Sequence, residues 1–171
     1  MPLLEIRNLQ TSFFTDNGEV KAVNGISYNL DHGKVLGIVG ESGSGKSMSA
    51  LAIAGLLSRH DMKKRGSIVF EGREILNCPR NELRDLQGDE ITMVFQEPLT
   101  SLNPVKKIGW QVEESLKIHT NLTPEERKAK AIAALADVEL DDPERVYDSY
   151  PHELSGGMRQ RVMIAAAMIG N

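Results

Sequence analysis

Apolar and polar residues alternate along the N-terminal part of the chain, a pattern typical of half-buried strands. The strand-forming runs occupy residues 4–9, 12–15, 20–24 and 25–30. Turn-forming residues lie between and after these runs, at 16–19 and again at 31–33. Because adjacent strands joined by short turns pair antiparallel, the pattern predicts an antiparallel β-layer at the start of the chain.

Apolar runs later in the sequence change the predicted fold class from all-β to α/β. Residues 35–39, 67–70 and 91–95 are short and rich in β-branched or aromatic residues, which predicts further strands, the first and last of them buried. Residues 48–57 are rich in Ala and Leu and predict a helix. This order of strands and helices indicates an α/β fold.

Helical spacing dominates from residue 105 to residue 150. Residues 108–119 carry apolar side chains at helical intervals, and Trp110 is expected to pack between helices. Thr123 and Pro124 open a capped helix that is expected to bury one face. That face is Ala129, Ile132, Ala133 and Ala136. We therefore predict a helical subdomain inserted into the α/β core.

A nearly all-apolar run at 162–169 predicts a buried helix near the end of the sequence. The whole chain of 171 residues suits one domain. We expect this domain to consist of a β-rich core at 1–104, a helical subdomain at 105–153, and a final motif and helix at 154–171.

Composition narrows the range of partners. The chain has 20 Lys and Arg against 24 Asp and Glu, a net charge of -4 that does not suggest a nucleic-acid binder. Residues 63–65 are locally basic and are expected to form a solvated loop. The single cysteine, Cys78, excludes an internal disulfide. The run at 162–169 is too short to cross a bilayer, so we expect any membrane role to come through a partner chain.

The clearest chemical motif is a glycine-rich loop that reads G-x-x-x-x-G-K-S at residues 40–47, between a predicted strand and a predicted helix. Glycines at 40, 43 and 45 let several backbone N–H groups face one point at a helix N-terminus, where phosphate binds well. Lys46 would reach the β- and γ-phosphates, and Ser47 would ligate Mg²⁺. The alternative is a Gly/Ser-rich turn before an ordinary helix. By itself the loop indicates only a nucleoside triphosphate.

A second glycine motif lies at residues 154–160, where Ser155 can cap the following helix and Gly156 and Gly157 allow a ligand close to the backbone. The alternative is a capped core helix after a glycine turn. Phe13 or Phe14 could stack on a nucleotide base, although from the pattern either is also an ordinary core residue.

Taken together, the motifs resemble those of a known family. Residues 40–47, 95–98 and 154–157 resemble, in order and spacing, the Walker A loop, Q-loop and signature motif of ABC transporter ATPases. The longer strings at 37–47, 101–104 and 150–165 resemble the dipeptide and oligopeptide importer subfamily, although nickel and glutathione importers share much of this pattern. The resemblance implies a RecA-like P-loop NTPase core with an antiparallel β-layer and an inserted helical subdomain.

The resemblance also implies roles for individual residues. Phe13 would stack on adenine, with Phe14 as the nearby alternative, and Lys46 and Gln96 would serve catalysis. Ser47 and Gln96 would approach Mg²⁺. The remaining loop positions implied in ATP binding are Gly40, Glu41, Ser42, Gly43, Ser44, Gly45 and Met48. Ser155, Gly156 and Gly157 would contact the ATP held by an opposite subunit, while Met158 departs from the glutamine common at its position.

Partners and location follow from the same resemblance. It implies ATP and Mg²⁺ as cofactors, transmembrane permease subunits, and a second ATPase subunit arranged head-to-tail, either identical or related. It also implies an indirect link to a substrate-binding protein, no nucleic acid, and a peripheral place on the cytoplasmic face of the inner membrane. The alternatives are a soluble ABC ATPase of a nucleic-acid machine and a nucleotide-gated module without catalysis.

One part of the family pattern is absent from the sequence. No apolar run ends in Asp-Glu, so the Walker B aspartate, the catalytic glutamate and the switch histidine have no counterparts among these residues. Glu90 precedes its predicted strand and does not replace them. We therefore expect the 171 residues to be an N-terminal fragment, truncated before the Walker B strand, that binds ATP weakly without appreciable hydrolysis.

Overall fold

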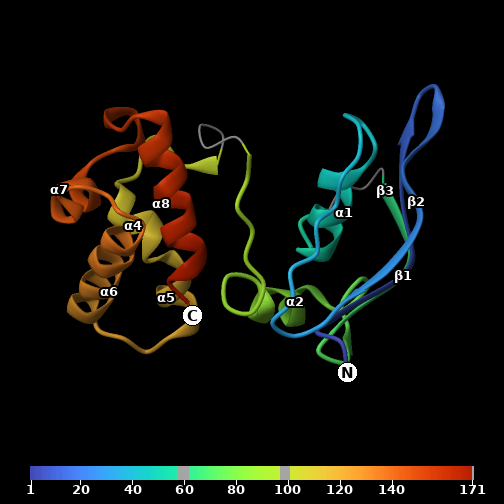
Figure 1. The fold of residues 1–171 in the computed structure, drawn as a ribbon, viewed down its shortest axis with the longest axis horizontal. Coiled ribbons are helices and arrows are strands. Elements are labelled where there is room, and N and C mark those ends of the chain that lie inside the picture. The colour runs from blue at the N-terminus through green and yellow to red at the C-terminus, as the bar shows by residue number, and fades with distance from the viewer. Residues whose placement is uncertain (58–61, 97–100, 171) are drawn as a thin grey trace. The chain divides into compact units, whose positions relative to one another are not determined.

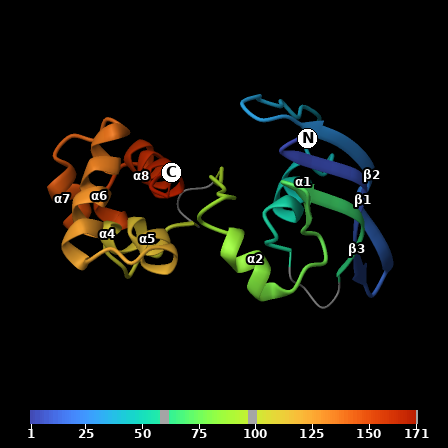
Figure 2. The same cartoon turned by 90° about the horizontal axis from the view of Figure 1, so that it is seen from below.

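The computed structural model describes residues 1–57, 62–96 and 101–170, shown as ribbons in Figures 1 and 2. It divides into two compact units, Met1–Arg84 and Asp85–Asn171. Each unit is described by itself below. Helix α2 (Arg80–Leu86) contains the boundary between them.

The first unit is built on one antiparallel sheet with the strand order β2-β1-β3-β4. The strands are β1 (Leu4–Thr15), β2 (Gly18–Leu30), β3 (Met62–Phe70) and β4 (Arg73–Glu74). The predicted antiparallel β-layer is confirmed, and the predicted turn joins Thr15 to Gly18. The prediction of a basic loop at 63–65 was wrong, because these residues pair with β1 inside β3.

Helix α1 (Lys46–Ile53) packs beside this sheet (Figure 1), and apolar side chains fill the space between them. Ile6, Leu9 and Ile68 are fully buried in the sheet, and Ala52 is buried on the helix. The helix predicted after the glycine loop is therefore confirmed. It buries a stripe of small residues because these allow a helix to lie close to a sheet.

Two predicted strands do not form. Residues 35–39 are irregular, with Val35 99% and Val39 94% exposed. In the run at 91–95, only Ile91 makes a bridge, to Gln87, and the following residues are irregular. Both runs have strand-forming side chains, but a strand also needs a hydrogen-bonded neighbour. No strand within the described ranges of the chain pairs with either run.

The second unit is helical. Its elements are α4 (Ile108–Val112), α5 (Glu114–His119), α6 (Pro124–Asp137), α7 (Pro143–Asp148), a 3₁₀ turn (Pro151–Glu153) and α8 (Gly156–Met168). The helical character predicted for residues 105–150 is confirmed, and an apolar cluster lies at the centre of the unit. The fully buried members of that cluster include Ile108, Val112, Leu135, Val146 and Val162. The helix predicted at 108–119 is divided at Glu113 into α4 and α5.

Two predictions about helix faces were wrong. Helix α6 buries Ala131 and Leu135 rather than the predicted alanine face, because alanines surround the helix and the larger Leu135 decides which side enters the core. Trp110 is 43% exposed, with the ammonium groups of Lys106 and Lys117 over its ring at 4.7 and 5.0 Å. The run at 162–169, predicted to be buried, is buried or half-buried except for Met168.

Helix α6 begins with the predicted capping box: Thr123 accepts from the Glu126 N–H, and the Glu126 carboxylate accepts from the Thr123 N–H. The backbone and side-chain hydrogen bonds from Thr123 lower the pKa of Glu126. Among the helices that the structure describes, none has the length and apolar character that crossing a bilayer requires.

Candidate functional site

The glycine loop forms the N-terminus of α1. Gly45 is the residue that precedes the helix, with a φ of 90°, and Gly43 has a φ of 82°. Both angles favour glycine, because other residues rarely adopt positive φ. Gly45 has no side chain to bond the first N–H groups of the helix, so they stay available to a ligand at the positive end of the helix dipole.

The ammonium group of Lys46 spans the loop. Its Nζ donates to the carbonyl oxygens of Gly40 and Glu41, both at 2.7 Å, and to the hydroxyl of Ser44 at 3.4 Å. These contacts hold the positive charge against the loop backbone. A phosphate that enters the loop therefore meets a cation already in place, together with the N–H groups of the helix start.

Close packing explains why position 45 of the loop is glycine. A Cβ on Gly45 would approach the carbonyl oxygen of Ala22 on β2 to under 3.0 Å, which real Cβ atoms essentially never do. A Cβ on Gly40 would lie 2.8 Å from the hydroxyl of Ser44, a side-chain end that can rotate away. The loop therefore rests directly on the backbone of β2, and the sheet fixes its position.

The strand register separates the two candidate aromatic residues. Side chains alternate between the two faces of β1. Thr11 is buried and pairs with Val23 on β2. The side chain of Val23 would contact a Cβ at Gly45, so Thr11 marks the face on which the glycine loop lies. Phe13 lies two positions from Thr11 and shares this face, so it is half-buried on the side of the glycine loop.

Phe14 belongs to the opposite face of the sheet. Its ring is 41% exposed, and the ammonium of Lys63 lies 4.8 Å from the ring centroid. Sequence reasoning left both phenylalanines open as partners of a nucleotide base. The register favours Phe13, because only Phe13 shares a face with the loop.

A magnesium site is only partly supplied by the described residues. The hydroxyl oxygen of Ser47 is exposed in the first turn of α1, and such a hard oxygen suits Mg²⁺. No group of three or more His, Cys, Asp or Glu that could hold a metal occurs in the described part of the chain. The donor set therefore fits an ion held largely by nucleotide phosphates, with Ser47 as one protein ligand.

Gln96 lies in the second unit, exposed at the end of an irregular stretch. Two side chains of α5 contact the backbone before this stretch. Ser115 donates to the Gly88 carbonyl, and the ring Nε2 of His119 lies 2.8 Å from the Gln87 carbonyl. Residues 97–100, which include Pro98 of the stretch that resembles a Q-loop, lie outside the described residues. Gln96 and Ser47 belong to different units, so no distance between them is defined.

The second glycine motif begins α8, as predicted. Ser155 precedes the helix, and its hydroxyl accepts from the Met158 N–H at 3.3 Å. Gly156 and Gly157 are exposed, and a Cβ on either would meet nothing within 4 Å. Packing in this chain therefore does not require glycine at these positions. Their bare backbone suits the close approach of another molecule to a helix N-terminus.

Sequence reasoning missed Glu113, which is 6% exposed and lies at the junction of α4 and α5. The available signal was an acidic residue directly after Val112 in an apolar helical pattern. It was overlooked because an acidic residue in a helix is normally exposed.

A family model described as "ABC transporter" matches residues 23–171. The oligopeptide transport ATP-binding protein OppD of Haemophilus influenzae is 46% identical over 168 residues, covering 98% of this chain and 52% of that protein. OppD of Bacillus subtilis is 45% identical over 170 residues, covering 99% of this chain and 48% of that protein. The chain thus spans about half the length of the curated relatives it matches.

Solved structures agree with these sequence matches. The dimeric ATP-binding cassette MJ0796, in a post-hydrolysis state bound to ADP and Pi, has a TM-score of 0.86 at 28% identity, covering 98% of this chain and 70% of that chain. The cbiO1 protein of Clostridium perfringens, part of the transporter complex cbiONQ, has a TM-score of 0.70 at 26% identity. The match covers 99% of this chain and 62% of that chain. These relatives give no support to a nucleic-acid machine.

Proposed function

The chain belongs to the ABC transporter family, and from this premise we propose that it is the ATP-binding part of an ATPase subunit that drives import of peptides or a similar solute. The names of the OppD relatives support the peptide cargo. The proposed divisions are the core at 1–104, the helical subdomain at 105–153, and the signature motif with its helix at 154–171.

The observation that carries this proposal is the presence of two exposed, glycine-edged helix N-termini, at Lys46 and at Ser155. A γ-phosphate under attack by water develops charge that donors must stabilise from several sides. The first N-terminus supplies an ammonium and backbone N–H groups. The second supplies the backbone of Gly156 and Gly157, which is exposed and is not covered by side chains in the described part of the chain.

In this proposal the loop at residues 40–48 holds the phosphates of ATP, and Lys46 neutralises part of their charge. Phe13 stacks on adenine. Ser47 and Gln96 hold Mg²⁺, which when bound would neutralise the phosphate charge. The half-buried position of Phe13 on the loop side of the sheet, and the exposed hydroxyl of Ser47, support these roles.

We propose that the second N-terminus acts on ATP held by a second copy of the chain. A head-to-tail pair with two-fold symmetry uses each surface twice and therefore builds two equal sites. The dimeric form of the MJ0796 cassette supports this arrangement. ATP then joins the copies, and hydrolysis releases them. Permease subunits would receive this motion at the cytoplasmic face of the membrane.

Nucleotide titration tests the binding half of this proposal. ATP should bind to the protein, and Lys46→Ala should weaken binding about tenfold or more, because it removes a charge-assisted contact to phosphate. Mg²⁺ should strengthen binding to the wild-type protein. Equal affinity in the wild type and Lys46→Ala, measured by calorimetry, would contradict the assignment of the loop.

A further inference from the structure

Two segments far apart in the sequence meet along a continuous line in the second unit. One is the start of α4 with the Glu113 junction, and the other is residues 147–149 at the end of α7. We call this contact the α4–α7 seam. At one end, Lys107 Nζ donates to Asp148 Oδ1 at 3.0 Å, and the Ile108 N–H donates to the Ser149 carbonyl at 2.9 Å. Next along the seam, the Cα of Gly109 packs against the ring of Tyr147. At the other end, the Tyr147 hydroxyl donates to Glu113.

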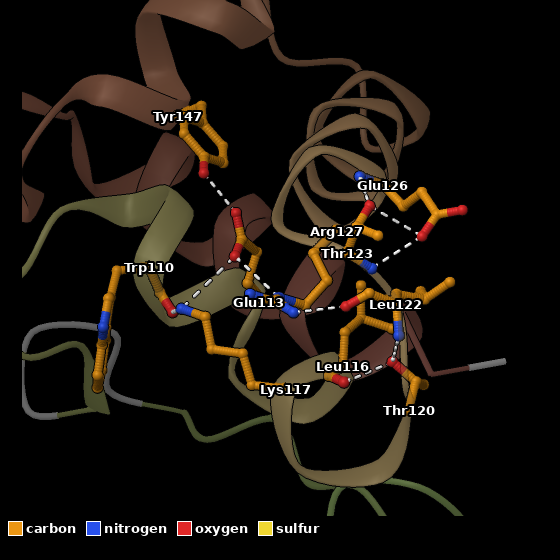
Figure 3. Close-up of polar contacts among 10 residues, drawn as sticks. All are labelled: Trp110, Glu113, Leu116, Lys117, Thr120, Leu122, Thr123, Glu126, Arg127 and Tyr147. Carbon is orange, nitrogen blue, oxygen red and sulfur yellow. Dashed lines mark hydrogen bonds and ion pairs between the residues drawn. The ribbon is translucent and has the colours of Figure 1, made fainter.

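Glu113 forms the buried end of the seam, and Figure 3 shows the residues around its carboxylate. Its carboxylate accepts from the Tyr147 hydroxyl and forms ion pairs with Lys117 at 3.5 Å and Arg127 at 3.6 Å. A carboxylate that is 6% exposed requires such partners, because an unpaired buried charge is strongly destabilising. Arg127 also donates to the Leu122 carbonyl at 2.6 Å, so one carboxylate joins the α4–α5 junction to α6 and α7.

Residues 102–106, which precede the seam in the sequence, are also fixed to the helical unit. Leu102 is buried in the helical core. The side-chain amide of Gln111 accepts from the Asn103 N–H at 2.7 Å and donates to the carbonyls of Asn103 and Lys106. The backbone from residue 102 to α4 is therefore fixed to the same helix that forms the seam.

On the other side, the seam leads directly to the second glycine motif. Ser149 is followed by a 3₁₀ turn in which the Glu153 carboxylate accepts from the Tyr150 N–H at 2.6 Å. Arg159 on α8 donates to the Pro151 carbonyl at 3.4 Å. Hydrogen bonds thus follow the chain from the seam to the first turns of α8.

We propose that the α4–α7 seam sets the position of the Ser155–Gly157 backbone, and that Tyr147 and Glu113 are positioning residues for the ATP site of the paired subunit. This inference rests on the proposed function. Loss of the Tyr147 hydroxyl frees the end of α7 from the Glu113 junction while its ring still packs on Gly109. The entrance to α8 then becomes free to shift, although the phosphate loop in the first unit keeps its structure.

The test uses the natural full-length protein and measures ATP-driven pairing by light scattering. Tyr147→Phe should weaken pairing at least about fivefold, the size expected when a coupling network loses one contact. ATP affinity, measured at dilutions where the protein is unpaired, should stay within about twofold of wild type. Because a general loss of stability in the second unit would also weaken pairing, a control variant separates the two causes.

Ala133→Gly is the matched control, because glycine at this exposed position destabilises α6 of the same unit by about 1 kcal/mol, on a later turn of the helix than Arg127 and outside the seam. It should lower the melting temperature and leave pairing unchanged. If Tyr147→Phe fails to fold, Asp148→Asn removes the exposed end of the seam and should weaken pairing about twofold.

The outcomes separate the two proposals. If the wild type pairs with ATP and a folded Tyr147→Phe or Asp148→Asn variant pairs equally well, the seam proposal is wrong and the proposed function stands. The same holds if Ala133→Gly weakens pairing as much as Tyr147→Phe. If the wild type binds ATP but never pairs, both the pairing part of the proposed function and the seam proposal are wrong.

Discussion

Gly45 and the carbonyl oxygen of Ala22 lie in direct contact, so that a single added carbon on Gly45 would overlap β2. The contact joins the start of α1 to the sheet. Gly43, in the same loop, also has a positive φ, but a Cβ there would meet nothing within 4 Å. The two glycines therefore separate the effect of backbone strain from the effect of close packing.

Gly43→Ala should cost about 1 kcal/mol of stability, because alanine is strained at positive φ. Gly45→Ala should cost a further 1–3 kcal/mol or so, because the loop must also move away from β2. Urea unfolding of both variants measures the difference. Equal losses in the two variants would show that the loop does not rest on the sheet.

A matched pair also tests the assignment of the adenine-stacking residue. Phe13→Ala should weaken ATP binding about tenfold, since stacking of a base on an aromatic ring contributes roughly 1–3 kcal/mol. Phe14→Ala should leave ATP affinity within about twofold, because Phe14 lies on the other face, beside Lys63. The opposite order of effects in a nucleotide titration would mean that the register argument had selected the wrong residue.

The Tyr147 hydroxyl makes stability depend on alkaline pH. Burial and then the hydrogen bond to Glu113 raise the pKa of Tyr147 from 10.0 to about 12; the charges of Glu113 and Asp148 act in the same direction, and Arg127 opposes them. A raised pKa in the folded state means that the stabilisation is complete below pH 10 and is lost as the pH rises through 12.

Denaturation midpoints measured across this alkaline range test that prediction. The wild type should lose more stability between pH 10 and pH 12 than Tyr147→Phe, which lacks the titrating hydroxyl. Ultraviolet titration of tyrosinate should likewise show a late component that is absent from the variant. Identical pH profiles for the two proteins would contradict the buried contact with Glu113.

The 171 residues should bind ATP without appreciable turnover. Hydrolysis needs a group that orients the attacking water, and the sequence has no apolar run ending in an Asp-Glu pair. A phosphate-release assay on the purified chain, compared with Lys46→Ala, checks this. Steady turnover that Lys46→Ala abolishes would show that other residues perform the missing role.

Local sequence signals predicted much of the architecture. The capping box at Thr123, the capping serine at Ser155 and the turn before Gly18 were all predicted, because each depends on a few neighbouring residues. The same is true of the glycine loop at the start of α1. Such features are specified within one or two turns of the chain, where residue type and spacing decide the outcome.

Features that depend on distant residues were predicted poorly. The apolar run at 35–39 has strand-forming side chains, but pairing decides whether a strand forms, and no described strand pairs with it. The buried face of α6 depends on which neighbours Leu135 meets. The Glu113 cluster joins residues from α4 to α7 and leaves almost no trace in the local pattern.

The most direct test of the account mixes two defective variants of the natural full-length protein and measures ATP hydrolysis. Lys46→Ala disables the phosphate loop. Gly157→Asp places a negative charge where the γ-phosphate should bind, at a helix start that tolerates an acidic residue. In a mixed pair, one of the two sites combines an intact Lys46 with an intact Gly157 from the other copy.

The account predicts that each variant alone is inactive and that each mixed pair recovers about half of the wild-type rate. Recovery requires that the two glycine-edged helix starts act on one ATP from different copies. A mixture that stays inactive while the wild type hydrolyses ATP, or a single variant that keeps the wild-type rate, would contradict this central claim.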